Sequence, residues 1–385
     1  MRPDFLPFSK PSISEGDIDA VVSVLRSGWI TTGKVAAEFE SELANYIGCA
    51  NPGVAVTSAT AGLQVLLKAL DIGPGDEVLT PSLTWVSTIN LIELCGATPV
   101  FVDVDKDTLL LSVSDLASKI TAKSKLIIPV HYAGVPADLP AIYELAQKHQ
   151  LRVIEDSAHA IGTYLNDVHV GKQGTSIFSL HPIKNITSGE GGVITSDDED
   201  LLNRVKRLKF HGLGVDAFDR SMQGRSPQAE VLEPGFKFNL PDMQAALGLS
   251  QLHRIEELVA ARTKLAARYD ELLKGVDGIL PLQIPNYSLR HAWHLYIVRI
   301  DSDKVGLSRD EFMSRLKELN IGTGLHFKAA HVQRYYREKR PEWLGKLPQT
   351  EWNSARIMSL PLFPDMKIED VDTVVSAIKE VLAKV

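Results

Sequence analysis

The sequence predicts an α/β protein in which a mainly parallel sheet is flanked by helices, followed by a smaller C-terminal α+β domain. The first observation is a series of short apolar runs that begins near residue 53. The second is that segments of helical length separate most of these runs, which is typical of βαβ units. The third is a change of pattern near residue 255, from which we expect a large domain over 1–255, N-terminal arm included, and a small domain over 256–385.

Seven apolar runs are predicted to form the strands of the large domain. They cover 53–57, 77–80, 98–104, 125–130, 152–156, 176–180 and 192–196. Helices are expected between several of them, over 60–70, 87–95 and 138–149. The last two runs are joined by a glycine-rich segment that is too short for a helical crossover, so we expect one antiparallel strand there.

The remaining helices are predicted from caps and apolar periodicity. Ser14 and Asp17 indicate a capped helix that ends at Gly28. A long helical stretch is expected over 242–274, and an alternating strand over 294–300. The C-terminal helix presents one apolar face, made of Ile368, Val371, Val374, Val375, Ile378, Val381 and Leu382.

Composition narrows the class of protein. The 385 residues include 44% hydrophobic residues and carry a net charge of −7, which argues against a nucleic-acid-binding surface. Cys49 and Cys95 are the two cysteines, so reduced thiols and a cytoplasmic location are expected. The first residues lack the apolar region of a signal peptide, and no run of about 18 apolar residues predicts a membrane span.

Ligands of open α/β sheets bind outside the carboxyl ends of the strands, and three predicted strands end in polar segments. The run 53–57 leads into Ser58, Ala59 and Thr60 at a helix N-terminus, where backbone N–H groups can bind a phosphate. A plain helix cap explains this segment equally well. The run 152–156 ends at Asp156, a carboxylate that needs a cation or donors near the sheet interior. Alone, Asp156 is better explained by a structural salt bridge.

The third polar segment contains a lysine. Lys184 lies in a glycine-bounded loop after the run 176–180, and its neighbours are hydroxyls, histidine and glycine rather than charges. A solvated surface lysine is the ordinary alternative, with a pKa of about 10.4. A partly buried lysine near a pyridinium and a phosphate can instead have its amine tuned to form a Schiff base.

Together the three segments fit pyridoxal phosphate (PLP). This cofactor needs a lysine, a carboxylate at its ring nitrogen, a phosphate cradle and an aromatic residue on its ring face. Lys184, Asp156 and residues 57–60 can fill three of these roles. Trp85 can fill the fourth, because an indole at a strand-to-helix turn is expected to be more exposed than a core tryptophan.

The whole chain resembles the sugar-nucleotide aminotransferase family of the aspartate-aminotransferase fold type, which is PLP-dependent transferase fold type I. The resemblance rests on TSATAGL, PSLTWVST, VIEDSAHA, SLHPIKNITSGEGG and PGFKFNLPDMQAA. It implies a PLP-dependent transaminase in which Lys184 is catalytic and forms the imine with the cofactor. The other cofactor-binding residues that it implies are Ala59, Thr60, Trp85, Asp156, His159, Ser179 and Asn239.

The resemblance also implies the partners. Asn239 is expected to reach the phosphate of a neighbouring subunit, which makes the protein a homodimer with shared sites. His326 is expected on the substrate side, and Trp29 or His326 could limit the space around C5 of the sugar. The stretches SGWITTG, KFHGLGVDAFDR and GTGLHFKAAHVQRYY are most similar to a branch that uses glutamate and a UDP-linked 4-ketopentose. Its product, UDP-4-amino-4-deoxy-L-arabinose, serves lipid A modification and polymyxin resistance.

Several alternatives remain open at this stage. The substrate could be another keto-sugar nucleotide, such as a 4-keto-6-deoxyhexose, and a non-catalytic ligand-binding module on the same fold is the rival from another class. No nucleic acid and no membrane insertion are expected. The pairs His291 with His294 and His326 with His331 lack the carboxylate or cysteine that would complete a metal site, so no metal is predicted.

Overall fold

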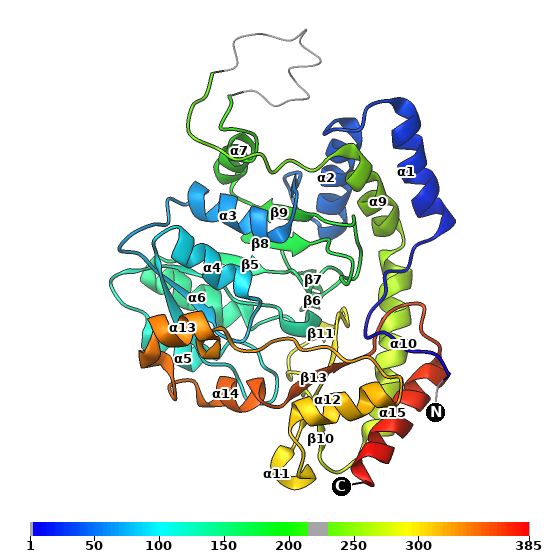
Figure 1. Cartoon of the computed structure of the whole chain (residues 1–385). Helices are drawn as coiled ribbons and strands as arrows, with labels where there is room; N and C mark the ends of the chain where they lie inside the picture. Colours follow the sequence, from blue (N-terminus) through cyan, green and yellow to red (C-terminus); the bar gives the residue numbers. More distant parts are fainter. Residues whose placement is uncertain (1–2, 215–229, 385) are drawn as a thin grey trace.

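The computed structural model describes residues 3–214 and 230–384, and its centre is a seven-stranded sheet of order β1-β9-β8-β5-β4-β2-β3 (Figure 1). The strands are β1 Val54–Val56, β2 Glu77–Pro81, β3 Thr98–Val102, β4 Ser124–Ile127, β5 Arg152–Asp156, β8 Thr175–Ser179 and β9 Gly192–Ser196. All seven predicted strands are therefore confirmed. β9 pairs antiparallel with both β1 and β8, and the other neighbours pair parallel, so the expected antiparallel strand is β9.

Helices bury both faces of this sheet. One face is covered by α3 Ala59–Ala69, α4 Val86–Leu94 and α7 Glu199–Leu208; the other by α2 Lys34–Ile47, α5 Val113–Lys119, α6 Leu139–His149 and α9 Asp242–His253. Neighbouring strand residues point to opposite faces, so Val78 joins the first layer and Leu79 the second. This explains why the strands read as continuous apolar runs rather than as alternating patterns.

The strand directions bring the polar segments together. Because β1, β2, β5 and β8 all run the same way, their carboxyl ends meet at one edge of the sheet. Asp156 lies at the end of β5, and Thr60, Trp85 and Lys184 lie in the segments that follow β1, β2 and β8.

The N-terminal helix has the predicted ends. In α1 Glu15–Ser27, Ser14 and Asp17 form a capping box, and Gly28 ends the helix with a φ of 76°. The helix packs on α9. The expected helical stretch 242–274 is divided in two, because Arg254 has φ −106° and ψ 4° and separates α9 from α10 Ile255–Leu273.

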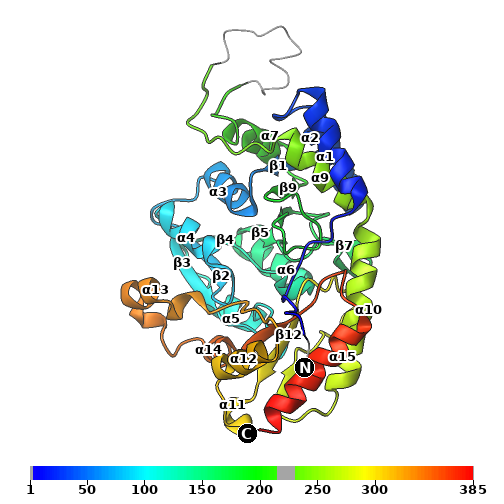
Figure 2. The same ribbon diagram turned by 45° about the vertical axis from the view of Figure 1, so that its right-hand side comes forward.

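The C-terminal part is built around a second sheet, of order β10-β12-β13. Its elements are β10 Ile279–Pro281, β12 Tyr296–Ile300, β13 Ile357–Leu360, α11 Ser302–Val305, α12 Arg309–Glu318, α13 Arg334–Lys339, α14 Pro348–Ser354 and α15 Ile368–Leu382. The predicted apolar face of α15 packs into the core of this part. Figure 2 shows the N-terminal segment reaching the same region, where Leu6 bridges Ile321.

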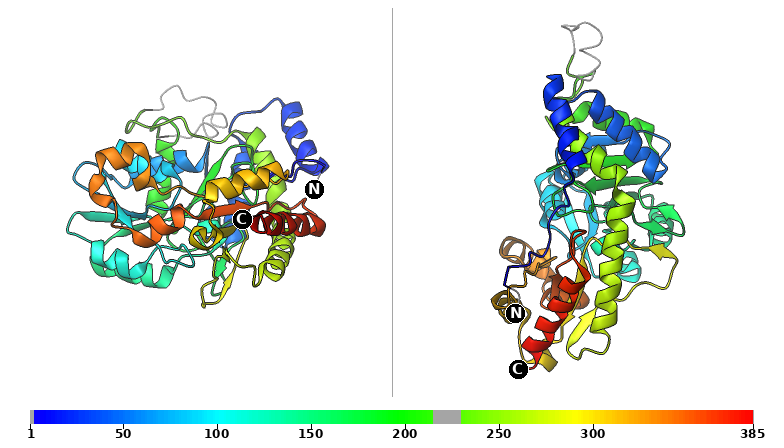
Figure 3. Two further views of the ribbon diagram at one scale, coloured as in Figure 1. Left: turned by 60° about the horizontal axis from the view of Figure 1, so that its bottom comes forward. Right: turned by 90° about the vertical axis from the view of Figure 1, so that its right-hand side faces the viewer.

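Two features join the parts. α10 runs beside both, since Leu258 lies in a core of the large sheet and Tyr269 in the C-terminal core (Figure 3). A small sheet pairs β6 Tyr164–Leu165 and β7 Val168–His169 with β11 Leu289–Arg290. Short 3₁₀ turns occupy η1 Tyr132–Gly134, η2 Ala330–Val332 and η3 Pro341–Trp343. The division of the chain at residue 255 stays a prediction.

None of the helices in the described ranges has the length and the apolar character that crossing a membrane would require.

Candidate active site

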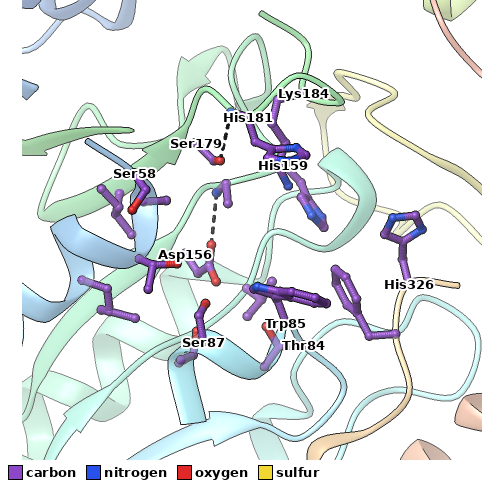
Figure 4. A pocket seen from close by; sticks show the side chains of 18 of the residues that line it. Ser58, Thr84, Trp85, Ser87, Asp156, His159, Ser179, His181, Lys184 and His326 are labelled. Carbon is purple, nitrogen blue, oxygen red and sulfur yellow. Dashed lines mark hydrogen bonds between the residues drawn. The ribbon is translucent and has the colours of Figure 1, made fainter. Parts of the chain in front are cut away.

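A cavity of about 340 Å³ opens at the carboxyl edge of the large sheet (Figure 4). Its walls come from the turns after β1, β2, β5 and β8 and from residues 325–327 of the C-terminal part. Eight of the residues predicted from the sequence line it: Ala59, Thr60, Trp85, Asp156, His159, Ser179, Lys184 and His326. A volume of this size is typical of small-molecule sites.

Asp156 is fixed by the backbone at the end of β5. Its N–H donates to the carbonyl of Pro129 at 2.8 Å, and its own carbonyl accepts from the N–H of His131 at 3.1 Å. The Oδ1 accepts from the N–H of Ala158 at 3.1 Å. Burial raises the pKa of the carboxyl, whereas the Ala158 hydrogen bond and the positive charge of Lys184 lower it. Asp156 would therefore gain from a cation placed against it.

Lys184 faces the same cavity from the loop after β8. The loop is held by the N–H of Lys184, which donates to the carbonyl of His181 at 2.9 Å, and by Asn185, whose side chain donates to the carbonyl of Ala292 at 2.6 Å. Burial lowers the pKa of the Lys184 amine to about 8, and Asp156 opposes that shift. Lys184 is not a solvated surface lysine, and its neutral amine is available near neutral pH.

The N-terminus of α3 forms another wall. Ser58 caps the helix, since its Oγ accepts from the N–H of Ala61 at 3.0 Å, so the ordinary cap is present. The first turn, with Ala59 and Thr60, also opens into the cavity. Gly192 of β9 lies against this turn so closely that a Cβ there would stand 2.6 Å from the N of Ala59. The glycine is required by close approach rather than by backbone conformation.

Trp85 precedes α4 and is 58% exposed, so it is not a core tryptophan. Its ring centroid lies 5.7 Å from that of Phe327. The two aromatic side chains belong to opposite walls of the cavity, one from the large sheet and one from the C-terminal part.

Two buried histidines line the cavity in their neutral forms. The Nδ1 of His159 accepts from the N–H of Ala133 at 3.3 Å, and burial, with Lys184 and His326 adding to it, holds the pKa of His159 well below its ordinary value. Burial and the nearby Lys184 lower the pKa of His326 to about 4. The Nδ1 of His326 lies 2.7 Å from the Oγ of Ser359. Both rings can therefore form hydrogen bonds with a ligand without carrying charge.

Further lining residues were missed in the sequence, namely Thr84, Ser87, Thr88, His181, Glu190 and Phe327. Most of them are sequence neighbours of predicted residues, such as Thr84 beside Trp85 and Phe327 beside His326. This adjacency was the only sequence signal that could have identified them. The Oγ of Ser179 accepts from the N–H of His181 at 3.4 Å.

Trp29 and Asn239 do not line this cavity within one chain. Asn239 is buried, and its side-chain amide donates to the hydroxyl of Thr32. The indole N–H of Trp29 donates to the carbonyl of the same Thr32 at 3.2 Å. The two residues therefore lie together, and Asn239 is bridged to Val56 at the end of β1.

Neither of the histidine pairs weighed as metal ligands belongs to a cluster of metal ligands in the described part of the chain. In residues 3–214 and 230–384, no group of three or more His, Cys, Asp or Glu side chains is arranged to hold a metal ion. His291 stacks on Trp293 with centroids 3.9 Å apart, and His294 lies 4.3 Å from the ring of His159.

Solved structures of similar fold match the whole chain. A structure described as a sugar aminotransferase from Streptococcus pneumoniae matches in its PMP form with a TM-score of 0.91 and 32% identity, covering 98% of this chain and 99% of that one. Its PLP form matches with a TM-score of 0.89. Helicobacter pylori PseC, an aminotransferase involved in the biosynthesis of pseudoaminic acid, matches with a TM-score of 0.91 and 27% identity over 99% of this chain and 100% of that one. The fold and these similarities define a PLP-dependent sugar aminotransferase.

The sequence comparisons give the family. The DegT/DnrJ/EryC1/StrS aminotransferase family matches residues 11–379, and the chain belongs to this family. The UDP-4-amino-4-deoxy-L-arabinose–oxoglutarate aminotransferase of Shewanella sediminis is 55% identical over 99% of both chains.

Proposed function

We propose that the chain transfers the amino group of glutamate to the C4 keto group of a UDP-linked ketopentose, giving UDP-4-amino-4-deoxy-L-arabinose and 2-oxoglutarate. The observation that carries the chemistry is the placement of Lys184 and Asp156 in one cavity, with the pKa of the lysine lowered to about 8. The substrate assignment rests on the name of the relative from Shewanella sediminis. We assign the product to lipid A modification, as its sugar implies.

The residues of the cavity fit PLP. Asp156 would pair with a protonated ring nitrogen, which supplies the counter-charge that the buried carboxyl lacks. The first turn of α3 and Ser179 would hold the phosphate, because helix N-termini bind anions. Trp85 would cover one face of the ring, and Lys184 would bond to the aldehyde. When bound, PLP supplies the electron sink that stabilises negative charge on the amino donor.

Lys184 is also the group that moves the proton. With PLP and substrate bound, the Nζ of Lys184 would take the proton from Cα of glutamate and would later deliver a proton to C4 of the sugar. With a pKa of about 8, the Lys184 amine can both accept and donate a proton near neutral pH. His159 and His326 are neutral at that pH. They orient groups beside Lys184 and do not compete with it for the proton.

One cavity serves both substrates. Lys184 and Asp156 lie on the side of the large sheet, whereas His326 and Phe327 enter from the C-terminal part. We assign the sugar to the side of His326 and the reacting amine to the side of Lys184. Glutamate and the sugar nucleotide therefore react in turn, which gives ping-pong kinetics.

We propose a homodimer that shares its sites. Asn239 and Trp29 lie together through Thr32, and the segment 13–30 that carries Trp29 also carries exposed apolar side chains: Ile13, Ile18, Leu25 and Ile30. Such a patch on α1 and the turn after it fits a second copy of the chain. If Asn239 reaches the phosphate of the neighbouring cavity, Trp29 reaches that cavity as well. We also propose a cytoplasmic location, supported by the free thiols of Cys49 and Cys95.

The test is a panel of keto-sugar nucleotides with PLP and glutamate, followed by mass spectrometry of the products. We expect the UDP-4-ketopentose to be aminated with a catalytic efficiency about 10–200-fold above that of a 4-keto-6-deoxyhexose nucleotide, because one methyl in a filled pocket is worth about 1–3 kcal/mol. Equal or better use of the hexose would refute the pentose assignment. No aminated sugar from any member of the panel, with Lys184→Ala as the blank, would refute the transfer to a nucleotide sugar.

A further inference from the structure

Three side chains form a hydrogen-bonded chain behind the cavity without lining it. The Oγ of Ser82 lies 2.7 Å from the Nδ1 of His331, and the Nε2 of His331 lies 3.2 Å from the Oε1 of Glu351. Ser82 and His331 are fully buried, and Glu351 is partly exposed. A serine, a histidine and a carboxylate in this order can form a nucleophile in an open site, but a fully buried Ser82 cannot reach a substrate.

Backbone contacts determine which groups donate and which accept in these hydrogen bonds. The N–H of His331 donates to the Oγ of Ser82 at 3.1 Å, so the hydroxyl is free to donate its own proton to Nδ1. The Nε2–H then donates to Glu351, which also accepts from the N–H of Gly345 at 2.7 Å. The N–H of Ala330 donates to the carbonyl of Ser82 at 2.8 Å. The hydroxyl of Ser82 and both ring nitrogens of His331 therefore have partners, which makes the geometry of these hydrogen bonds well defined.

The hydrogen bonds of Ser82, His331 and Glu351 join the two walls of the cavity. Ser82 belongs to the turn after β2 that carries Thr84 and Trp85, and His331 belongs to the segment that carries His326 and Phe327. The ring centroids of Trp85 and Phe327 lie 5.7 Å apart, and the ring planes are tilted by 49° to each other.

The same segment is anchored at its other end. The Oγ of Ser359 holds the ring of His326, and the hydroxyl of Tyr132 donates to the His326 carbonyl. Residues 325–327 are thus anchored by two sets of contacts, those of His326 and the Ser82–His331 hydrogen bond. The Ser82–His331 hydrogen bond is the one that connects this segment to the turn that carries Trp85.

We propose that Ser82, His331 and Glu351 are positioning residues that set the gap between Trp85 and Phe327 and thereby select the sugar nucleotide. The inference rests on the proposed function, since it assumes that the sugar enters beside Phe327. Glutamate reacts at Lys184 and Asp156, which the turns after β5 and β8 hold independently of this chain. Removing the hydrogen bonds of Ser82, His331 or Glu351 should therefore weaken the sugar half-reaction and leave the glutamate half-reaction unchanged.

The test measures the two half-reactions separately on the PLP-loaded enzyme. Stopped-flow absorbance follows the cofactor as it reacts with glutamate, and then as the aminated form reacts with the UDP-ketosugar. The variants are Ser82→Ala, His331→Phe, Glu351→Ala and Glu351→Gln. His253→Phe is the matched control, because His253 also pairs with a glutamate, Glu42 at 2.6 Å, but is exposed and away from the cavity.

We expect Ser82→Ala, His331→Phe and Glu351→Ala to raise the half-saturating concentration of the ketosugar about tenfold, which corresponds to about 1.4 kcal/mol. The glutamate constants should stay within about twofold of the wild type. Glu351→Gln should behave like the wild type, because an amide oxygen can still accept from the Nε2–H of His331 and from Gly345. The fluorescence of Trp85, isolated by subtracting the same variants carrying Trp85→Phe, should shift to longer wavelength as contact with Phe327 loosens.

Three results would overturn the proposal. Equal losses in both half-reactions, a Glu351→Gln variant as impaired as Glu351→Ala, or unchanged kinetic constants with only a lower melting temperature would each indicate a purely structural role. If His331→Phe fails to fold, the Glu351 variants still distinguish a positioning role from a purely structural role, because Glu351 is partly exposed. Failure of the proposed function looks different, since the wild-type enzyme itself would not react with glutamate and the ketosugar.

Discussion

Gly192→Ala offers a sharp test of the phosphate cradle, because it adds one methyl group where β9 meets the N-terminus of α3. The new Cβ would stand 2.6 Å from the N of Ala59 and 2.8 Å from the carbonyl carbon of Ser58. Both contacts are to backbone, which cannot swing away as a flexible side chain could. An ordinary contact begins at 3.4 Å, so the turn must retreat by about 0.8 Å.

The size of the effect follows from that displacement. Overpacking of this kind costs about 1–3 kcal/mol, and the loss of a glycine from the unfolded chain returns about 0.4–1 kcal/mol. A net destabilisation of about 0.5–2 kcal/mol is therefore expected. A hydrogen bond from Ala59 or Thr60 to phosphate, normally about 2.9 Å long, would stretch beyond its useful range. Hydrogen bonds to charged groups are worth about 1.5–3 kcal/mol, so the dissociation constant of PLP should rise about tenfold to a hundredfold.

The assay combines urea unfolding of the cofactor-free protein with titration of PLP by absorbance. Gly16→Ala is the control, because a Cβ there meets only the Oγ of Ser14 at 3.7 Å within α1. The control should be neutral or slightly stabilising, with unchanged PLP affinity. Unchanged PLP affinity in Gly192→Ala, despite reduced stability, would refute the assignment of the phosphate to the first turn of α3.

Three further predictions concern the cavity. Asp156→Asn should keep the circular dichroism of the wild type and lose about 10²–10³ in turnover, since an amide cannot hold the ring nitrogen protonated; near-normal turnover would make Asp156 a structural residue. In the cofactor-free protein, competitive labelling should give Lys184 an apparent pKa near 8, and a value near 10.4 would contradict the burial described here. Because the unfolded chain binds a proton on this lysine between about pH 8 and 10.4 that the folded protein does not, Lys184 should make stability rise with pH in that window. Mixing Lys184→Ala with Asn239→Ala chains should restore some activity by complementation, and mixed dimers without activity would mean that Asn239 acts within its own chain.

The sequence predicted the large sheet well, because its signals are local. Apolar runs buried on both faces, such as 152–156, and caps such as Ser14 need no knowledge of distant residues. The strands β6, β7 and β11 escaped prediction because two residues are too few to show a period. The break at Arg254 escaped it because neither glycine nor proline marks the end of α9 there.

The candidate site divides in the same way. Asp156 and Lys184 were predictable because each follows a strand whose carboxyl end must face the ligand edge. The position of Phe327 was not, since only the packing of the C-terminal part brings its ring close to that of Trp85. The stretch 209–220, used in the resemblance, lies partly outside the described residues. Trp29 and Asn239 do not line the cavity within one chain, and their roles in a site stay predictions.

Borohydride reduction of the PLP-loaded enzyme, followed by peptide mapping, tests the central claim most directly. Reduction fixes the cofactor on the lysine that holds it, and a parallel sample is treated with excess glutamate before reduction. We predict that the cofactor mass appears on Lys184 in the first sample and is largely absent from it in the second, because glutamate releases the lysine. A label on another lysine, or a label on Lys184 that glutamate does not remove, would contradict the account.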